Sequence, residues 1–532
     1  MQWHKTLTPL GRQYSGSSLA GRLVGLTNLR RATPAAYRKV RDIVCTYERA
    51  GGIGSDLQLT ANEKQANDVI MALKLAEYQR GIMDPTQFAP GYHIFQMLYK
   101  IKQSPLFKVI SSMPKGGALK THDTSMCSSE FLIKLTHKPH LWVCTREDGR
   151  QYEIVQFRYA REQPSSNHQD CSWLRMEELR ESRGDRNVHE YLRARFSMYP
   201  LSRPQSNADA WSNMMSIFRL VDGLVKYEPN WGEYYYNALK EFHADEVQYV
   251  EVRSLLPRLY SLDGQKLQVS DTVKVYNEQL QRFKQQHPDF IDSKLIYAPL
   301  RHIDAAKLAT HVKLCTELNA AYPELLIGFD LVGQEDLGYP LSAFAMELLK
   351  LPQHINFYFH AGQTNWYGSP VDENLVDAVL LGTRRIAHGY ALCKHPLIMQ
   401  LVKQLGIAIE VCPVGNQVLQ LGTDYRNHPA ASFIANNIPF VISSGNPSFW
   451  RTTPLSHDFY LTFLGIAPMN ADLTFLKRLA KNSIKYSALK DEDKAKANEK
   501  WKLKWDKWID DVIAQRDELF VAEAKRKAEV QK

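Results

Sequence analysis

The chain has 532 residues, of which 44% are hydrophobic and 23% charged, so it can bury a large core and has the composition of a folded protein. No apolar run has the length of a membrane span, and no internal repeat is present. The formal net charge is +9, but eight basic residues and no acid lie between Met1 and Arg41. Subtracting those eight leaves about +1, so a nucleic-acid-binding surface is not expected on the folded part.

Residues 1–34 form a basic segment that we expect to be disordered or a targeting signal. This segment is rich in arginine and contains Ser15, Ser17 and Ser18, a composition that fits an organelle transit segment better than a secretory signal. A plain basic tail, or an incorrect gene start that has replaced a signal peptide, would look the same. Seven cysteines without a CxxC pair, and no permitted N-x-S/T site, give little sign of secretion. These residues favour an intracellular or mitochondrial location.

The following regions of the chain differ in composition and in hydrophobic pattern. Residues 35–112 contain long amphipathic stretches and are expected to be helical. Residues 136–204 are polar, charged and turn-rich, and they are expected to be an insertion outside the regular fold. The remainder alternates short apolar segments with helical ones. The insertion lies after the first apolar segment. We expect eight strands: Ala118–Asp123, Val247–Leu255, Lys294–Leu300, Leu325–Val332, Asn356–His360, Arg385–Gly389, Ile407–Val411 and Phe440–Ser444.

Eight such units predict an α/β fold, a (β/α)₈ TIM barrel. After Asp491 a charged helix is expected, with Trp501, Trp505 and Trp508 on one face that packs on the barrel. In such barrels the functional site lies at the carboxyl ends of the strands. Polar residues and glycines recur at those positions, in the segments 120–123, 333–336, 360–363, 387–389, 412–416 and 443–447.

These strand ends resemble the adenosine/AMP deaminase superfamily, whose pattern is HxHD, HAGE, a histidine before glycine on the sixth strand and paired aspartates on the eighth. The resemblance is closest to the adenosine deaminase-related growth factors, the group that contains adenosine deaminase 2. It rests on Met113-Pro-Lys-Gly-Gly-Ala-Leu, Gly328-Phe-Asp-Leu-Val-Gly, Phe359-His-Ala-Gly, Asn416-Gln-Val-Leu, Asn427-His-Pro and Asn482-Ser-Ile-Lys-Tyr-Ser, and it runs from about residue 40 to about residue 512.

The resemblance implies an organisation for the whole chain. Residues 35–112 would be a dimerisation extension, and residues 113–510 a deaminase-like barrel. Residues 136–204 would be a receptor-binding-like insertion in which Cys144 and Cys171 form a disulfide, and residues 511–532 a charged helix or tail. The expected partners are a second copy or a paralogue, adenosine, and a cell-surface receptor or glycan. The group is secreted, which opposes the location that the N-terminus favours.

Several metal and proton-transfer positions of the family are changed. Zinc would be held by His122 and His360, but Lys120 and Gly445 replace its other two protein ligands. Two imidazoles are a poor zinc site, and a lysine ammonium offers no acceptor. We therefore expect zinc to be absent or weakly bound unless His302 or Asn446 substitutes. The Lys120 ammonium is expected to fill the metal volume and to hydrogen-bond to Gln363 or to backbone carbonyls.

The substrate positions are mixed. Gln363 replaces the glutamate that protonates the purine, whereas His388 matches the histidine that steadies the attacking hydroxide. The substrate-binding positions are Asp123, Trp211, Phe218, Gly333 and Asn446, of which Asn446 replaces an aspartate; Leu300 stands in place of a histidine and Gly415 in place of a serine. Core packing alone would also explain Trp211 and Phe218.

These changes predict a catalytically inactive adenosine deaminase-like protein that acts by binding a nucleoside, a receptor or a partner. The alternative is an active or weakly active adenosine deaminase that hydrolyses adenosine to inosine and ammonia. A heterodimer with an active paralogue is a third possibility.

Overall fold

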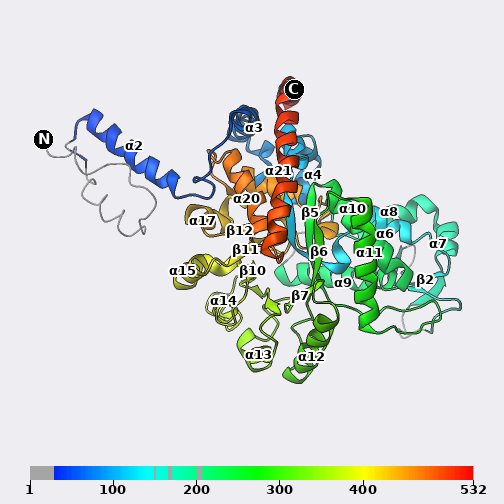
Figure 1. Cartoon of the computed structure of the whole chain (residues 1–532). Coiled ribbons are helices and arrows are strands. Elements are labelled where there is room, and N and C mark those ends of the chain that lie inside the picture. Colours follow the sequence, from blue (N-terminus) through cyan, green and yellow to red (C-terminus); the bar gives the residue numbers. More distant parts are fainter. Residues whose placement is uncertain (1–28, 31, 149–150, 166–170, 201–205, 531–532) are drawn as a thin grey trace.

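The computed structural model describes residues 29–30, 32–148, 151–165, 171–200 and 206–530, and its centre is a ring of parallel strands enclosed by helices (Figure 1). One sheet has the order β1-β5-β6-β7-β8 and another the order β12-β11-β10-β9. A parallel bridge from Thr121 to Gly445 joins β1 to β12. The strands of the ring are β1 Gly116–His122, β5 Val247–Ser254, β6 Asp292–Tyr297, β7 Leu326–Phe329, β8 Asn356–Phe357, β9 His360–Ala361, β10 Arg385–His388, β11 Ala408–Val411 and β12 Phe440–Ile442.

The strands fall at the eight predicted places, with β8 and β9 as two pieces of the fifth, so the predicted (β/α)₈ barrel is confirmed. β5 is buried at every position, as expected for a parallel strand covered on both faces. β1 begins at Gly116 with a φ of +76°, and a Cβ there would lie 2.8 Å from the carbonyl oxygen of Ala480. Glycine therefore lets β1 start directly against the helix α20 Leu473–Lys485.

Charged side chains fill the middle of the barrel as buried ion pairs. Arg253 contacts Asp330 at 2.8 Å and Glu410 at 2.7 Å, and Arg385 contacts Glu410 at 2.7 Å and also Glu251. All five side chains are buried. Removing one partner would leave an uncompensated buried charge, so this network fixes the relative positions of β5, β7, β10 and β11.

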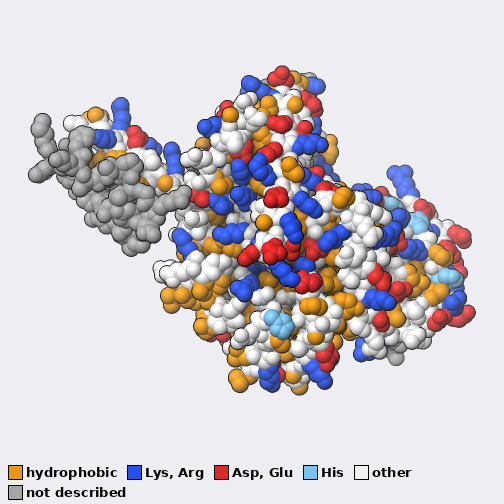
Figure 2. All heavy atoms as spheres, in the orientation of Figure 1, with side chains coloured by type: hydrophobic (Ala, Val, Ile, Leu, Met, Phe, Trp, Pro, Cys, Tyr) orange, Lys and Arg blue, Asp and Glu red, His pale blue; other side chains and the backbone are white. Residues whose placement is uncertain are grey.

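Helices precede, follow and separate the strands. The α-helices outside the insertion are α2 Pro34–Ala50, α3 Ala61–Met83, α4 Ile94–Lys102, α5 Pro105–Ser111, α6 Ser129–Leu135, α9 Asn207–Val225, α10 Glu228–Ala244, α11 Val269–Gln286, α12 Ala305–Ala321, α13 Leu341–Leu348, α14 Asn374–Leu380, α15 Pro396–Leu405, α16 Pro413–Val418, α17 Ala430–Ala435, α18 Pro447–Trp450, α19 Ser456–Leu461, α20, α21 Asp491–Ala514 and α22 Arg516–Val530. Short 3₁₀ or π turns lie at η1 Pro85–Gln87, η2 Ala89–Gly91, η3 Asp123–Ser125, η4 Tyr390–Lys394, η5 Tyr425–Asn427 and η6 Thr462–Ile466. None of the described helices combines the length and the apolar character that crossing a bilayer requires. Figure 2 shows basic and acidic side chains interspersed on the face that it presents, in keeping with a nearly neutral body.

The N-terminal helices and the C-terminal helix α21 pack together. α3 starts with a capping box in which Thr60 and Glu63 satisfy each other's backbone N–H groups. Trp501, Trp505 and Trp508 of α21 are buried on one face, as their spacing predicts, and their indole N–H groups donate to Pro114 O, Glu63 Oε1 and Val109 O. This face therefore packs on the N-terminal helices as well as at the start of the barrel. α2 has no buried residue and projects away from the body (Figure 1).

The segment expected to be an insertion has regular structure of its own, which the sequence did not predict. β2 Leu141–Asp148, β3 Gln151–Tyr159 and β4 Ser172–Arg175 form an antiparallel sheet in the order β3-β2-β4, followed by α7 Met176–Arg183 and α8 Asp185–Arg195. A disulfide joins Cys144 of β2 to Cys171, with Cα atoms 5.5 Å apart. Most of the predicted basic segment 1–34 lies outside the described residues.

Candidate functional site

A cavity of about 250 Å³ opens at the carboxyl ends of the barrel strands. Nearly all the residues that the sequence singles out line it: Lys120, His122, Asp123, Trp211, Phe218, Leu300, Gly333, His360, Gln363, His388, Gly415 and Asn446. Gly445 and His302 are not in this lining, although Gly445 faces Lys120 and His302 lies beside Gly333. The barrel thus gathers side chains that are more than 300 residues apart in the sequence.

Three histidines stand at the floor of the cavity. The ring of His360 lies 5.4 Å from those of both His122 and His388. Burial lowers the pKa of each well below its ordinary value, so all three are neutral imidazoles near neutral pH. Asp330 lies 2.7 Å from His360 Nδ1 and accepts the His360 backbone N–H at 2.9 Å, which leaves Nε2 of this ring for the cavity.

His388 is held in a costly backbone conformation. Its φ is +66°, in the left-handed region where a side chain with a Cβ costs about 1–2 kcal/mol. Such strain persists only where the surroundings impose it, and it concentrates at functional sites. The carboxyl end of β10 thus presents this imidazole to the cavity at a cost in backbone stability.

The Lys120 side chain occupies the space that a metal ion, and an aspartate ligand at position 445, would need. Its Nζ is 3.0 Å from His388 Nε2 and donates to Cys412 Sγ at 3.8 Å. These partners replace the expected Gln363 or backbone carbonyls. A Cβ built on Gly445, whose φ is +77°, would lie 3.0 Å from this Nζ. The lysine side chain therefore occupies the space into which an aspartate at position 445 would extend.

A chain of hydrogen bonds fixes the protonation of Lys120. The backbone N–H of Ala430 donates to His428 Nδ1 at 3.1 Å, so His428 carries its proton on Nε2 and donates to Asn416 Oδ1 at 3.1 Å. Asn416 then donates from Nδ2 to His388 Nδ1 at 3.1 Å. His388 must carry its proton on Nε2, facing Lys120, and only a neutral amine can accept that proton.

This hydrogen-bond pattern favours a neutral amine over the expected ammonium. Burial also lowers the pKa of Lys120, in agreement with the direction that the hydrogen bonds require. What opposes a metal here is the volume of the lysine side chain and the use of its lone pair by His388.

The donor set does not fit a zinc ion. A metal site needs at least three ligand atoms close together. Among the residues that the structure describes, no three ligand atoms of His, Cys, Asp or Glu in the cavity all lie within 4.8 Å of one another. Asn446, a suggested substitute, accepts a hydrogen bond from Ser125 at 2.7 Å through Oδ1. Zinc requires four ligands in a tetrahedral arrangement or three with an open position.

The rest of the cavity is suited to a flat, partly polar molecule. Trp211 and Phe218 come from α9, and the Phe218 ring packs edge-on against Phe449 at 4.7 Å. Asp123 accepts hydrogen bonds from Ser254 Oγ and Leu255 N, both at 2.9 Å, while burial raises its pKa to about 6. The wall therefore combines aromatic surface with the fixed carboxyl group of Asp123.

Some residues of this site received no role from the sequence. Asp330 orients His360, while Asn416 and His428 set the tautomer of His388. Asp330 interrupts an apolar strand, and a buried acid near a histidine of another strand is a recognisable orienting partner. Cys412 gives no comparable signal, because one buried thiol resembles ordinary core packing.

Comparisons with known proteins show the family and agree with the fold. The family model described as "Adenosine deaminase" matches residues 195–502, and the model "Adenosine/AMP deaminase N-terminal" matches residues 19–110. An adenosine deaminase of Lutzomyia longipalpis is 47% identical over 89% of this chain and 93% of its own length. The chain is a member of the adenosine deaminase family. Human adenosine deaminase 2 is 38% identical over 87% of this chain and 92% of its own length.

Solved structures support the fold alone. An N6-mAMP deaminase of Arabidopsis has a TM-score of 0.54 at 15% identity, covering 74% of this chain and 99% of its own. An amidohydrolase from Burkholderia, solved with bound Zn, has a TM-score of 0.52 at 17% identity, covering 77% and 95%. The family is zinc-dependent, so the altered donor set of this member stands out against it.

Proposed function

We propose that this chain binds a purine nucleoside at the barrel mouth without converting it. The position of Lys120 carries this proposal, because its Nζ lies 3.0 Å from where a side chain on Gly445 would begin. The aromatic wall and Asp123 remain in the cavity, so a nucleoside can still be enclosed. The volume of about 250 Å³ is near the lower end of ligand pockets, roughly 300–1,000 Å³.

The loss of a proton-transfer group also supports a catalytically inactive site. Gln363 is buried, with its backbone N–H donating to Glu335 at 2.6 Å, and its amide has no titratable proton to give to a purine. Loss of a general acid costs about 10²–10⁴ in rate. Without a metal to activate water, the nucleophile would be bulk water at neutral pH. These losses act on different steps and compound one another.

Reversion tests the proposal. The variant carrying Lys120→His, Gln363→Glu, Gly445→Asp and Asn446→Asp should acquire zinc and form inosine from adenosine. The wild-type chain should form none above buffer but should bind adenosine and inosine in calorimetry. His189→Ala, on the insertion and outside the cavity lining, is the matched control and should behave as wild type. Wild-type turnover that disappears in His360→Ala would contradict the proposal.

A weakly active adenosine deaminase is the second candidate. His122, His360 and His388 are retained, Asp330 orients one of them, and many relatives carry the name adenosine deaminase. This candidate requires Lys120 to leave its contact with His388 so that a metal can enter. Added zinc should then raise turnover in the wild-type chain, whereas a catalytically inactive site predicts no turnover with or without zinc.

Partner binding is a further part of the proposal. The unburied amphipathic helix α2 supports a dimer, with a second copy or a paralogue, through the N-terminal helices. The small sheet of the insertion supports recognition of a receptor or glycan outside the barrel. Its disulfide supports secretion, since disulfides persist in oxidising compartments. Deleting residues 34–50 should convert a dimer to a monomer in light scattering, and an unchanged mass would refute the role of α2.

A further inference from the structure

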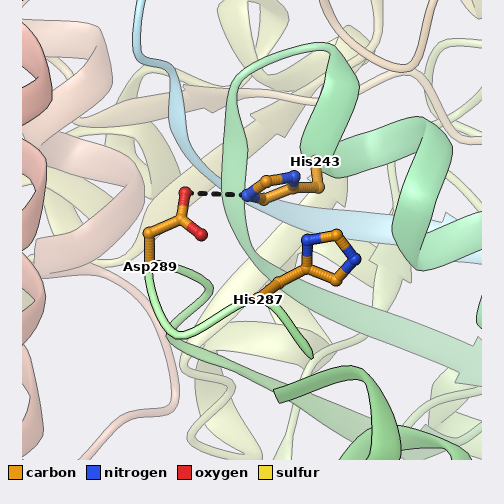
Figure 3. Close-up of side chains that lie close together, drawn as sticks. All are labelled: His243, His287 and Asp289. Carbon is orange, nitrogen blue, oxygen red and sulfur yellow. Dashed lines mark hydrogen bonds and ion pairs between the residues drawn. The ribbon is translucent and has the colours of Figure 1, made fainter. Parts of the chain in front are cut away.

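Three side chains meet at the base of the barrel, at the opposite end from the cavity. His243 lies at the end of α10, just before β5 begins. His287 follows the last residue of α11, and Asp289 precedes β6. We call these three residues the base cluster. Figure 3 shows their side chains facing one another across a small space.

The base cluster already has the spacing of a metal site. One ligand atom from each residue lies within 4.8 Å of the other two. His243 Nε2 is 2.8 Å from Asp289 Oδ2, and the two imidazole rings are 4.9 Å apart. The His287 ring stacks on buried Phe283 with centroids 4.3 Å apart, so packing restricts its orientation. Little rearrangement separates this geometry from coordination.

The donor types select the class of ion. Two imidazole nitrogens and one carboxylate oxygen suit zinc and other late first-row divalent metals, with water completing the shell. Ca²⁺ and Mg²⁺ require sites made mostly of oxygen. The side chains of His243 and Asp289 are 22% and 41% exposed, so an ion and its water can reach them. We propose that the base cluster binds one late first-row divalent metal ion, with Zn²⁺ as the probe.

The ammonium group of Lys504 in α21 would compete with a bound metal ion for Asp289. Its Nζ lies 2.7 Å from Asp289 Oδ2 and 3.3 Å from Glu246 Oε2. A metal at the base cluster would compete with this ammonium for Asp289, while Glu246 keeps an ion pair with it. Removing the ammonium should therefore strengthen metal binding. A purely structural role for the three residues predicts no such gain.

Zn²⁺ titration of the full chain in a calorimeter tests the proposal. The wild type should bind one equivalent that is lost in His243→Gln and in His287→Ala, and glutamine at 243 retains a donor toward Asp289. Lys504→Met should tighten binding about fivefold or more, since one unit charge about 4 Å away is worth at least ~1 kcal/mol. His360→Ala should bind as the wild type does. This places the ion outside the nucleoside cavity and makes the result independent of the proposed function.

The matched control is His189→Ala, because His189 of the insertion forms a histidine–carboxylate pair with Glu130 of α6 at 3.3 Å. This variant should keep the full stoichiometry. Co²⁺ gives a second readout, since its visible absorption reports imidazole coordination and should vanish in His243→Gln. Binding that survives both base-cluster variants, absent binding in the wild type, or a Lys504→Met affinity equal to that of the wild type would overturn the proposal.

Discussion

Replacing Lys120 by methionine tests whether the amine at the cavity floor is neutral. Its pKa is lowered from 10.5 in the folded chain, so between the folded and unfolded values the unfolded state binds more protons. Stability relative to Lys120→Met must then rise with pH, by about 1.4 kcal/mol per pH unit for one proton. The rise ends above the unfolded value, where both states are neutral.

The magnitude follows from the structure. If the amine is neutral in the folded chain at about pH 7.5, deprotonating the lysine on folding costs about 4 kcal/mol, and methionine avoids this cost. Methionine also loses the contacts to His388 and Cys412, worth about 1 kcal/mol each. Lys120→Met should therefore stabilise the chain by about 2–3 kcal/mol near pH 7.5, and this advantage should largely vanish by about pH 9.

Urea unfolding followed by tryptophan fluorescence at several pH values measures this difference. Lys108→Met, at a lysine whose side chain is 56% exposed, is the control and should give a difference that does not change with pH. A flat difference between wild type and Lys120→Met from about pH 7.5 to 9 would show that the ammonium persists, and it would refute the hydrogen-bond argument.

Further predictions concern the supports of the fold. Asp330→Asn should cost about 3–5 kcal/mol in urea unfolding because it breaks the buried contacts to Arg253 and His360, and a loss below about 1 kcal/mol would contradict that role. Cys171→Ser should destabilise the insertion by about 2–4 kcal/mol and expose it to proteolysis while the barrel stays intact. Equal cleavage of the insertion in the wild type and in the variant would refute this. Trp505→Ala should cost about 3–5 kcal/mol, measured by thermal unfolding, because the indole is buried and bonded to Glu63, and an unchanged midpoint would exclude its packing role.

The sequence predicted the barrel because its signal is local. Each strand is a short apolar run, and the polar residues end that run or follow it within a few residues; His122 and His388 are the last residues of β1 and β10. The insertion was missed as a sheet because its exposed strands carry many charges, which hide the alternation of Val143 and Thr145 on the buried side. Regular pairing there depends on contacts across β2, β3 and β4.

The chemistry of the cavity floor depends on contacts that no local pattern contains. Lys120 is 268 residues from His388 and 292 from Cys412, so neither partner could be inferred from spacing. The protonation of the lysine rests on a backbone N–H at Ala430, reached through three intervening side chains. The sequence could identify the substitution, but only the assembled barrel indicates what the substituted residue does.

Zinc content and inosine formation, measured together on one preparation, test the central claim most directly. The His243→Gln background removes the base cluster from the metal count, so any remaining zinc reports on the cavity. We predict substoichiometric zinc and no inosine above buffer, and near-stoichiometric zinc with turnover once positions 120, 363, 445 and 446 are reverted. Near-stoichiometric zinc with turnover in the unreverted chain, both lost in His360→Ala, would contradict the account.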